Sequence, residues 1–351
     1  MTPRSFHQIA TNFFILLASL LFIFYSVAYG FGIFKLDTNT KPDSNKAFVG
    51  LASDANKPLI EESEVLDDSA SLIFVGDIML SRGIGQVMEK NQSWKHLFLE
   101  VGDFLRSADL TFGNLEGPIS SRGTNMGSIY SFRANPDSVE GLLYAGFDVL
   151  SVANNHMWDY GGKALEDTLS ILKENGMSPV GAGSDYTDAH KPVVRDVKGT
   201  KIAFLAYTNL LPSSVSRKDS KPAVAYPDKS QMKADIENAK SMGDIVIVSF
   251  HFGDEYKTIH NALQEDLAHS AVDFGANLVV GHHPHVIQDT EIYKGVYIAY
   301  SLGNFIFDQN FNELTGSGLL LVVKVKDKKI EQIEEKVVQF NSLFQPYLRD
   351  E

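Results

Sequence analysis

The sequence has no cysteine among its 351 residues. This absence excludes disulfide bonds, thiolate metal ligands and cysteine nucleophiles, and it suits a protein outside the cytoplasm that does not depend on disulfides. Basic residues are also scarce, since 31 Lys and Arg stand against 44 Asp and Glu and give a net charge of −13. This balance argues against nonspecific nucleic-acid binding, which needs excess positive charge near the phosphates.

Charge of either sign is missing from one long segment, residues 12–34, which Arg4 precedes and Lys35 follows. A charge-free segment of more than ~18 residues can cross a bilayer as a helix. A cleaved signal peptide usually has a shorter apolar region, although Ala28-Tyr29-Gly30 would suit cleavage. We therefore predict a transmembrane signal anchor at 12–34, with residues 1–11 in the cytoplasm and the rest of the chain outside the cell membrane.

The part of the chain after the predicted anchor divides in two. Residues 35–70 are rich in Asp, Asn, Ser, Lys and Pro without periodicity, which predicts a linker. From residue 71 to 351, short apolar strands alternate with amphipathic helices, one of them expected at 94–106. This alternation predicts a layered α/β domain with largely parallel strands. The segments 318–325 and 330–340 predict an antiparallel hairpin at its end.

Three histidines follow an apolar run in LVVGHHPHVIQ, residues 278–288. If 277–281 is a buried strand, His282, His283 and His285 lie at its carboxyl end, where open α/β sheets hold their ligands. Imidazole is a common ligand for zinc and similar metals, and two rings one residue apart can approach the same ion. We expect a metal site here; the alternative is a histidine-rich surface turn. His190, His260 and His269 are assigned surface or structural roles.

Other predicted strands also end in side chains that can bind a metal or a phosphate. Carboxylates and imidazoles together suit manganese, iron or zinc, and a carboxylate between two ions is typical of hydrolytic sites. Because such strand ends can meet at one sheet edge, we expect one site holding one or two divalent ions. The residues concerned are Asp77, Asn114 with Glu116, Asn155 with His156, His251, and His283 with His285.

These motifs, in this order along the chain, resemble those of the CapA capsule-synthesis proteins of the calcineurin-like metallophosphatase superfamily. They are Gly76-Asp77, Gly113-Asn114-Leu115-Glu116, Ala153-Asn154-Asn155-His156 with Asp159, His251, Gly281-His282-His283-Pro284-His285, and Tyr300-Ser301-Leu302-Gly303-Asn304-Phe305. The resemblance covers residues 72–308. It implies a four-layer α-β-β-α fold, a role in making or exporting poly-γ-glutamate, and membrane ligase subunits as partners.

The resemblance also implies roles for individual residues. Asp77 stands where the first metal carboxylate is expected, and Glu116 or Asn114 where the bridging ligand is expected. Asn155, His251, His283 and His285 resemble further metal ligands, and His156, with Asp159, resembles the acid that protonates a leaving group. Met79 stands where the wider superfamily has a histidine, which leaves the number of ions at one or two.

Two further residues are candidates for substrate binding. The guanidinium of Arg82 can hold a phosphate or carboxylate; the alternative is a solvated helix residue. Asn304 can donate its amide to an oxyanion; the alternative is ordinary turn capping.

Three functions remain open from the sequence. The first is an accessory protein of capsule assembly. The second is a metal-dependent phosphatase or phosphodiesterase unrelated to capsules, and the third is a non-catalytic scaffold that binds an anionic polymer.

Overall fold

The computed structural model describes residues 68–213, 215–216, 218–309 and 311–349. The predicted anchor at 12–34 and nearly all of the predicted linker lie outside the described residues. Among the helices that are described, none has the length and apolar character needed to cross a membrane. The first strand, β1 (Ala70–Ile78), begins one residue earlier than predicted and is almost wholly buried.

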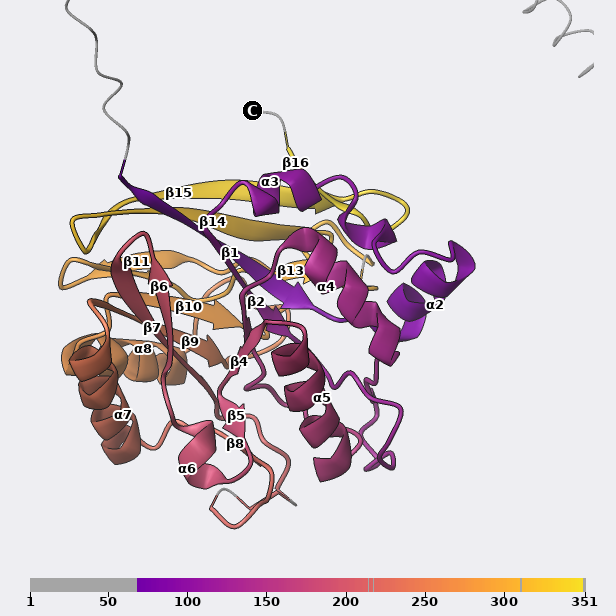
Figure 1. Cartoon of the computed structure of the whole chain (residues 1–351), viewed down its shortest axis with the longest axis horizontal. Helices are drawn as coiled ribbons and strands as arrows, with labels where there is room; N and C mark the ends of the chain where they lie inside the picture. Colours follow the sequence, from indigo (N-terminus) through magenta and orange to yellow (C-terminus); the bar gives the residue numbers. More distant parts are fainter. Residues whose placement is uncertain (1–67, 214, 217, 310, 350–351) are drawn as a thin grey trace, which may run out of the picture. The chain divides into compact units, whose positions relative to one another are not determined.

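An eight-stranded sheet is built around β1 (Figure 1). β1 pairs in parallel with β2 and β13 and antiparallel with β14, and the predicted hairpin is confirmed as β14 and β15. Along the sheet the order is β16-β15-β14-β1-β2-β3-β4. The strands that join β1 are β2 (Leu110–Leu115), β3 (Val149–Ser151), β4 (Ser178–Val180), β13 (Asn304–Ile306), β14 (Ser317–Lys326), β15 (Lys329–Phe340) and β16 (Pro346–Leu348).

A second, six-stranded sheet has the order β11-β12-β10-β9-β7-β6. Its four inner strands run parallel, and an antiparallel strand closes each edge. Among its described residues, the region 208–227, predicted as a loop, contributes β8 (Ala223–Val224), which pairs with β5 (Ala182–Gly183), besides Thr208 at the end of the preceding strand. The six strands are β6 (Val193–Val197), β7 (Thr200–Thr208), β9 (Ile245–His251), β10 (Leu278–His282), β11 (Thr290–Tyr293) and β12 (Val296–Ala299).

Alternate side chains of β7 show how the two sheets pack. Phe204 stacks on Phe112 of β2, with 5.7 Å between ring centroids, so this face lies between the sheets. Leu205 and Tyr207 point the other way, into a second core that includes Met232 and Leu267 of the covering helices. Strand side chains alternate between faces in this way when both faces are buried.

Helices cover the outer face of each sheet, as Figure 1 shows with α7 and α8 on one side and α4 and α5 on the other. The layers therefore follow the order α-β-β-α, as the family resemblance implies. The helices are α2 (Arg82–Lys90), α3 (Gly102–Arg106), α4 (Val139–Ala145), α5 (Gly162–Glu174), α6 (Tyr186–Ala189), α7 (Lys229–Met242) and α8 (Ala262–Phe274), with 3-10 turns η1 (His96–Phe98) and η2 (Pro136–Ser138).

The single helix predicted at 94–106 is wrong, because this region forms the separate elements η1 and α3. Gly102 lies at the break, and a Cβ there would come within 2.8 Å of the Tyr144 ring. Glycine also has low helix propensity. The apolar spacing still identified buried positions, since Leu97, Val101 and Leu105 are all in the core.

Candidate metal centre

The predicted ligands meet at one edge, where the carboxyl ends of parallel strands from both sheets come together. Asp77 of β1 is in register with Asn114 of β2 and with Asn304 of β13. His251 ends β9 and is in register with His282, which ends β10. The strand-end pattern in the sequence therefore corresponds to a three-dimensional cluster.

Asp77 is at the centre of this cluster and is fully buried. Its Oδ1 accepts a hydrogen bond from Asn114 Nδ2 at 2.8 Å, and its Oδ2 lies 3.3 Å from His285 Nδ1. Its Oδ1 also lies 3.5 Å from His282 Nδ1. Burial alone would raise the pKa of Asp77, but the contacts with His282 and His285 outweigh burial and hold the pKa well below its usual value. Asp77 is therefore a permanently charged carboxylate.

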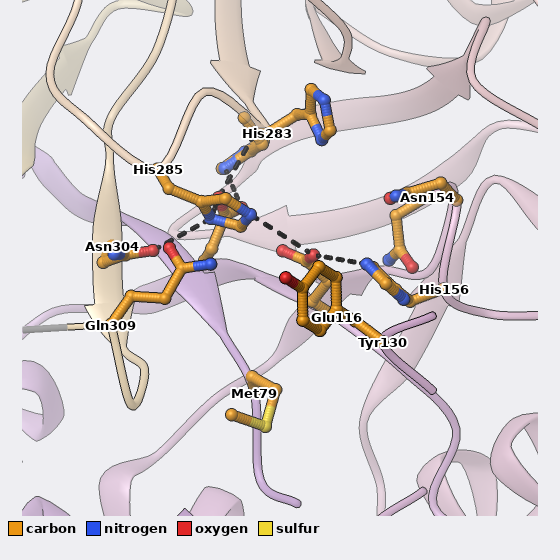
Figure 2. A network of polar contacts seen from close by, with 12 residues as sticks. Met79, Glu116, Tyr130, Asn154, His156, His283, His285, Asn304 and Gln309 are labelled. Carbon is orange, nitrogen blue, oxygen red and sulfur yellow. Dashed lines mark hydrogen bonds and ion pairs between the residues drawn. The ribbon is translucent and has the colours of Figure 1, made fainter. Parts of the chain in front are cut away.

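Glu116, just beyond β2, is buried without a hydrogen-bond donor for either carboxylate oxygen among the described residues. The nearest basic groups are imidazoles, with His156 Nε2 at 3.5 Å and His285 Nε2 at 3.8 Å from Oε1 (Figure 2). Burial raises the pKa of Glu116 to about 7. Burying a carboxylate without hydrogen-bond donors lowers the stability of the folded chain. A bound cation would provide the missing electrostatic partner.

The imidazole of His283 shows the same deficiency. His283 Nδ1 is buried and has no hydrogen-bond partner among the described residues, and burial, with His285 nearby, lowers the pKa of His283 to about 3. Burial likewise holds the pKa of His251 well below its usual value. Both rings are therefore neutral at physiological pH, which is the form that binds metals.

His285 differs from these two because carboxylates surround it. Burial alone would lower its pKa, but Glu116 and Asp77 outweigh burial and raise the pKa to about 9. Asn304 Oδ1 lies 3.0 Å from His285 Nδ1. The neighbours of Nδ1 are thus acceptors, so Nδ1 carries a proton and Nε2 is the atom available to a metal once the ring is neutral.

The candidate ligand atoms form two groups of three, and within each group the atoms lie within 4.8 Å of one another. One group consists of the buried Asp77, Glu116 and His251, and the other of His283, His285 and the exposed Glu255. The donor set of carboxylates and imidazoles, with unpartnered oxygens and nitrogens, fits a divalent cation. Glu255 was missed in the sequence, although a carboxylate four residues after His251 in the loop beyond β9 is a signal that would have found it.

The histidine loop has an unusual backbone. His283 has φ 99° and His285 has φ 58°, which place both residues in the left-handed region that side chains with a Cβ rarely adopt. Tyr256, beside Glu255, donates its backbone N–H to the carbonyl of Pro284 at 2.8 Å. The loop after β9 therefore supports the strained loop after β10, as is typical of sites where side chains must converge.

His156 is held at the edge of the cluster. Its Nδ1 lies 2.7 Å from Asp159 Oδ2, which also accepts the backbone N–H of Phe132 at 2.8 Å. The ring stacks on Phe132 with 3.9 Å between centroids. Asp159 therefore orients the ring and leaves Nε2 directed at Glu116 and the cavity beyond (Figure 2).

The predicted amide ligands take two positions. Asn155 Oδ1 lies 2.7 Å from His251 Nε2, at the rim of the cluster. Asn114 is deeper; its Nδ2 binds Asp77 and lies 3.2 Å from His251 Nδ1, while its Oδ1 accepts from Asn154 Nδ2 at 3.3 Å. Between the two residues expected at the bridging position, Glu116 is the one with free oxygens. Asn154, which was not singled out in the sequence, supports Asn114.

A cavity of about 190 Å³ opens beside His156 and His285. Arg82 lines it, paired with Asp308 at 3.0 Å, and its guanidinium lies 5.3 Å from the ring centroid of Phe132. Arg82 is therefore a cavity-lining residue with a carboxylate partner, and its contact with an anionic substrate group stays a prediction.

Asn304 has its amide nitrogen engaged within the protein, and Met79 lies apart from the cluster (Figure 2). The Asn304 amide nitrogen donates to the Thr315 carbonyl at 3.0 Å, and its oxygen faces His285, so the side chain is fully buried behind the cluster and positions a ligand. The Met79 sulfur accepts from the backbone N–H and hydroxyl of Ser81. Figure 2 shows Met79 turned away from the imidazoles, so Met79 itself does not contribute a ligand to the cluster.

Comparison with known proteins gives a consistent result. Residues 71–309 match the family model described as bacterial capsule synthesis protein PGA_cap. PGA biosynthesis protein CapA of Bacillus subtilis (strain 168) is 37% identical over 257 residues, which are 72% of this chain and 67% of that protein. Capsule biosynthesis protein CapA of Bacillus anthracis is 33% identical over 262 residues, 72% of this chain and 64% of that protein. The match thus spans about two thirds of these relatives.

Solved structures are more distant. A putative 5'-nucleotidase from Staphylococcus aureus, in complex with α-ketoglutarate, has 16% identity and a TM-score of 0.49 over 81% of this chain and 55% of that chain. A hypothetical protein from Thermus thermophilus has 17% identity and a TM-score of 0.48 over 77% of this chain and 99% of that chain. The family match and the sequence relatives confirm the resemblance to CapA, and the chain belongs to the bacterial capsule synthesis protein PGA_cap family.

Proposed function

We propose that this protein assists the synthesis or export of a poly-γ-glutamate capsule, and that its buried cluster is a hydrolytic centre holding one or two divalent metal ions. Family membership supports the first part. The observation that carries the second is Glu116, whose two buried oxygens have no hydrogen-bond donor among the described residues although imidazoles surround them.

The residues that would hold the metal fall into the two groups already described. Asp77, Glu116 and His251 would bind one ion, and His283, His285 and Glu255 a second. Asn155 is close enough to His251 to add an amide oxygen. This mixture of oxygen and nitrogen donors, without sulfur, is typical of manganese, iron or zinc.

A bound divalent ion would act as a Lewis acid and lower the pKa of a water molecule toward ~7. The protein's own residues perform the remaining work. His156 Nε2 faces the cavity and would donate a proton to the leaving group, while Asp159 keeps the proton on Nδ1. Arg82 would orient an anionic part of the substrate, and Asp308 fixes the guanidinium in place.

A single ion in a non-catalytic scaffold is the second candidate, and the position of Met79 favours it. The superfamily motif has a metal-binding histidine there, whereas the Met79 sulfur is occupied by Ser81. A thioether is also a weak ligand for a hard or borderline ion.

We also propose that residues 12–34 anchor the chain in the cell membrane, with residues 1–11 inside and residues 71–351 outside. The charge-free segment supports this arrangement. Its position would bring the domain close to membrane ligase subunits of a capsule synthase. Protease treatment of intact cells should degrade the domain, and a domain that is protected until the cells are lysed would contradict the topology.

The hydrolytic function is tested by reconstituting the full chain in detergent with manganese, iron or zinc. We expect close to two metal equivalents and turnover of a generic phosphodiester. His156→Ala should retain the metal and reduce turnover at least a hundredfold, within the usual contribution of general acid catalysis. One equivalent with no turnover would favour the scaffold, and no metal in the folded protein would contradict both candidates.

A further inference from the structure

Three exposed aromatic side chains stand around the cavity that leads to the metal centre. Tyr130, Tyr256 and Phe311 all line it, with 63%, 40% and 64% of their surfaces exposed. The rings of Tyr256 and Phe311 meet edge to face with 5.5 Å between centroids. Large apolar side chains gathered at the mouth of a polar cavity indicate a binding surface. These three residues are called the aromatic rim below.

The position of the aromatic rim in the cavity explains why it would matter. The cavity has a volume of about 190 Å³, and the aromatic rim lines it together with Arg82 and His156. A substrate whose anionic group lies beside Arg82 therefore also meets the aromatic rim.

The charge of the lining restricts what can lie there. Among the described residues that line the cavity, Arg82 is the only Lys or Arg, and it already pairs with Asp308. Aromatic faces carry negative potential, which repels carboxylates and attracts the positive edges of C–H bonds. A glutamyl polymer carries a carboxylate on every unit, so its second unit suits the rim poorly, whereas an uncharged ring suits it well.

Hydrogen-bonding groups at the rim favour a ring that carries hydroxyls. Gln309 donates from Nε2 to the Tyr256 hydroxyl at 3.2 Å, and its Oε1 is buried without a partner among the described residues. Figure 2 shows Gln309 and Tyr130 beside the carboxylate and imidazole cluster. A hydroxyl donor from a ligand would satisfy Gln309 Oε1, while the ring's C–H face packs on the aromatic side chains.

We propose that the aromatic rim binds the pyranose ring of a sugar phosphate whose phosphoryl group lies at the metal centre beside Arg82. This inference rests on the proposed metal centre and names its class of substrate. In capsule assembly, the centre would then act on a glycosyl phosphate and not on the glutamyl polymer itself.

The test compares two compounds that cannot be hydrolysed, the methylenephosphonate analogue of glucose 1-phosphate and methylphosphonate. Calorimetric titration into the manganese-loaded full chain should show at least tenfold tighter binding of the glucosyl analogue. Phe311→Ala, which leaves the contacts of Arg82 in place, should weaken the glucosyl analogue at least threefold and leave methylphosphonate unchanged. Tyr347→Ala is the matched control, because Tyr347 is an exposed aromatic residue of β16 outside the cavity.

Equal affinity for the two compounds would overturn the inference, as would a Phe311→Ala substitution that weakens both equally. Tighter binding of a short γ-glutamyl oligomer than of the glucosyl analogue would also overturn it. In these outcomes methylphosphonate still binds, so the proposed metal centre stands. If no metal and neither compound binds, the proposed function fails together with the inference.

Discussion

Two groups of histidines in this molecule differ in the partners of their imidazole nitrogens. Outside the cluster, His260 Nδ1 lies 2.8 Å from Asp289 and stacks on Tyr300, and His269 Nε2 lies 3.0 Å from Glu291. Each of these imidazoles has its own carboxylate. In the metal centre, by contrast, the rings of His251 and His283 crowd each other at 4.8 Å between centroids.

The difference shows which buried groups could gain stabilisation from a bound ligand. A buried polar group without a partner costs about 1–3 kcal/mol. The chain avoids this cost at His260 and His269 but accepts it at Glu116 and His283. Since His260 and His269 are paired with carboxylates, the unpaired Glu116 and His283 are the groups in this comparison that a ligand would complete.

The largest effect should come from removing two imidazoles of the unsatisfied group. Combining His283→Ala with His285→Ala removes two nitrogen ligands, so bound metal should fall at least tenfold from its value in the unsubstituted chain. Elemental analysis of the purified full chain measures this. Unchanged metal content would place the ion elsewhere. It would also show that the histidines of the metal centre do not differ from His260 and His269 in metal binding.

Metal removal should next reveal how much the cluster depends on a cation. Metal at 100 times its dissociation constant stabilises the folded state by about 2.7 kcal/mol. For a domain of this size the melting temperature should then drop by about 5–10 °C on chelation. Calorimetry with and without chelator measures the change, and an equal drop in the His283→Ala/His285→Ala chain would show that the chelator acts by another route.

A pH dependence of the metal-free protein should follow from His285. Its pKa is raised from 6.5 to about 9 in the folded state, so between these values the folded chain keeps a proton that the unfolded chain has lost. Stability should therefore fall as the pH rises from 6.5 to 9, by on the order of 2 kcal/mol. Glu116, whose pKa is raised to about 7, loses its proton at the lower end of this window and adds to the fall, whereas His251 and His283, whose pKa values are lowered, titrate below it.

Denaturant titrations of the chelated full chain at several pH values measure this slope. His285→Gln removes the titrating group but keeps polar contacts, so its stability should change less with pH between 6.5 and 9. A slope that persists in this variant would assign the effect to another group.

The smallest effect is expected in the satisfied group. His269→Ala removes one hydrogen bond to a partly exposed carboxylate and the stacking on Tyr293, so it should lower the free energy of unfolding by about 1 kcal/mol. Metal content should stay the same. A loss of metal here would mean that the two histidine groups are not independent.

The sequence predicted the centre of the site better than its surroundings. Asp77, His251 and the histidine loop follow strongly apolar strands, so their convergence followed from the rule for parallel sheets. Glu255 and the positioning role of Asn304 depend on how loops fold back, which strand periodicity does not contain.

The hydrogen bond from the Tyr256 backbone to Pro284 joins the cavity mouth to the loop that carries His283 and His285. A ligand that fixes Tyr256 would therefore act on the loop that presents those two imidazoles. If binding at the cavity mouth strengthens metal binding, the metal must strengthen binding at the mouth by the same factor, because linked equilibria are reciprocal. With positive coupling, bound substrate would slow the loss of metal, and the protein would lose its ion most readily when no substrate is bound.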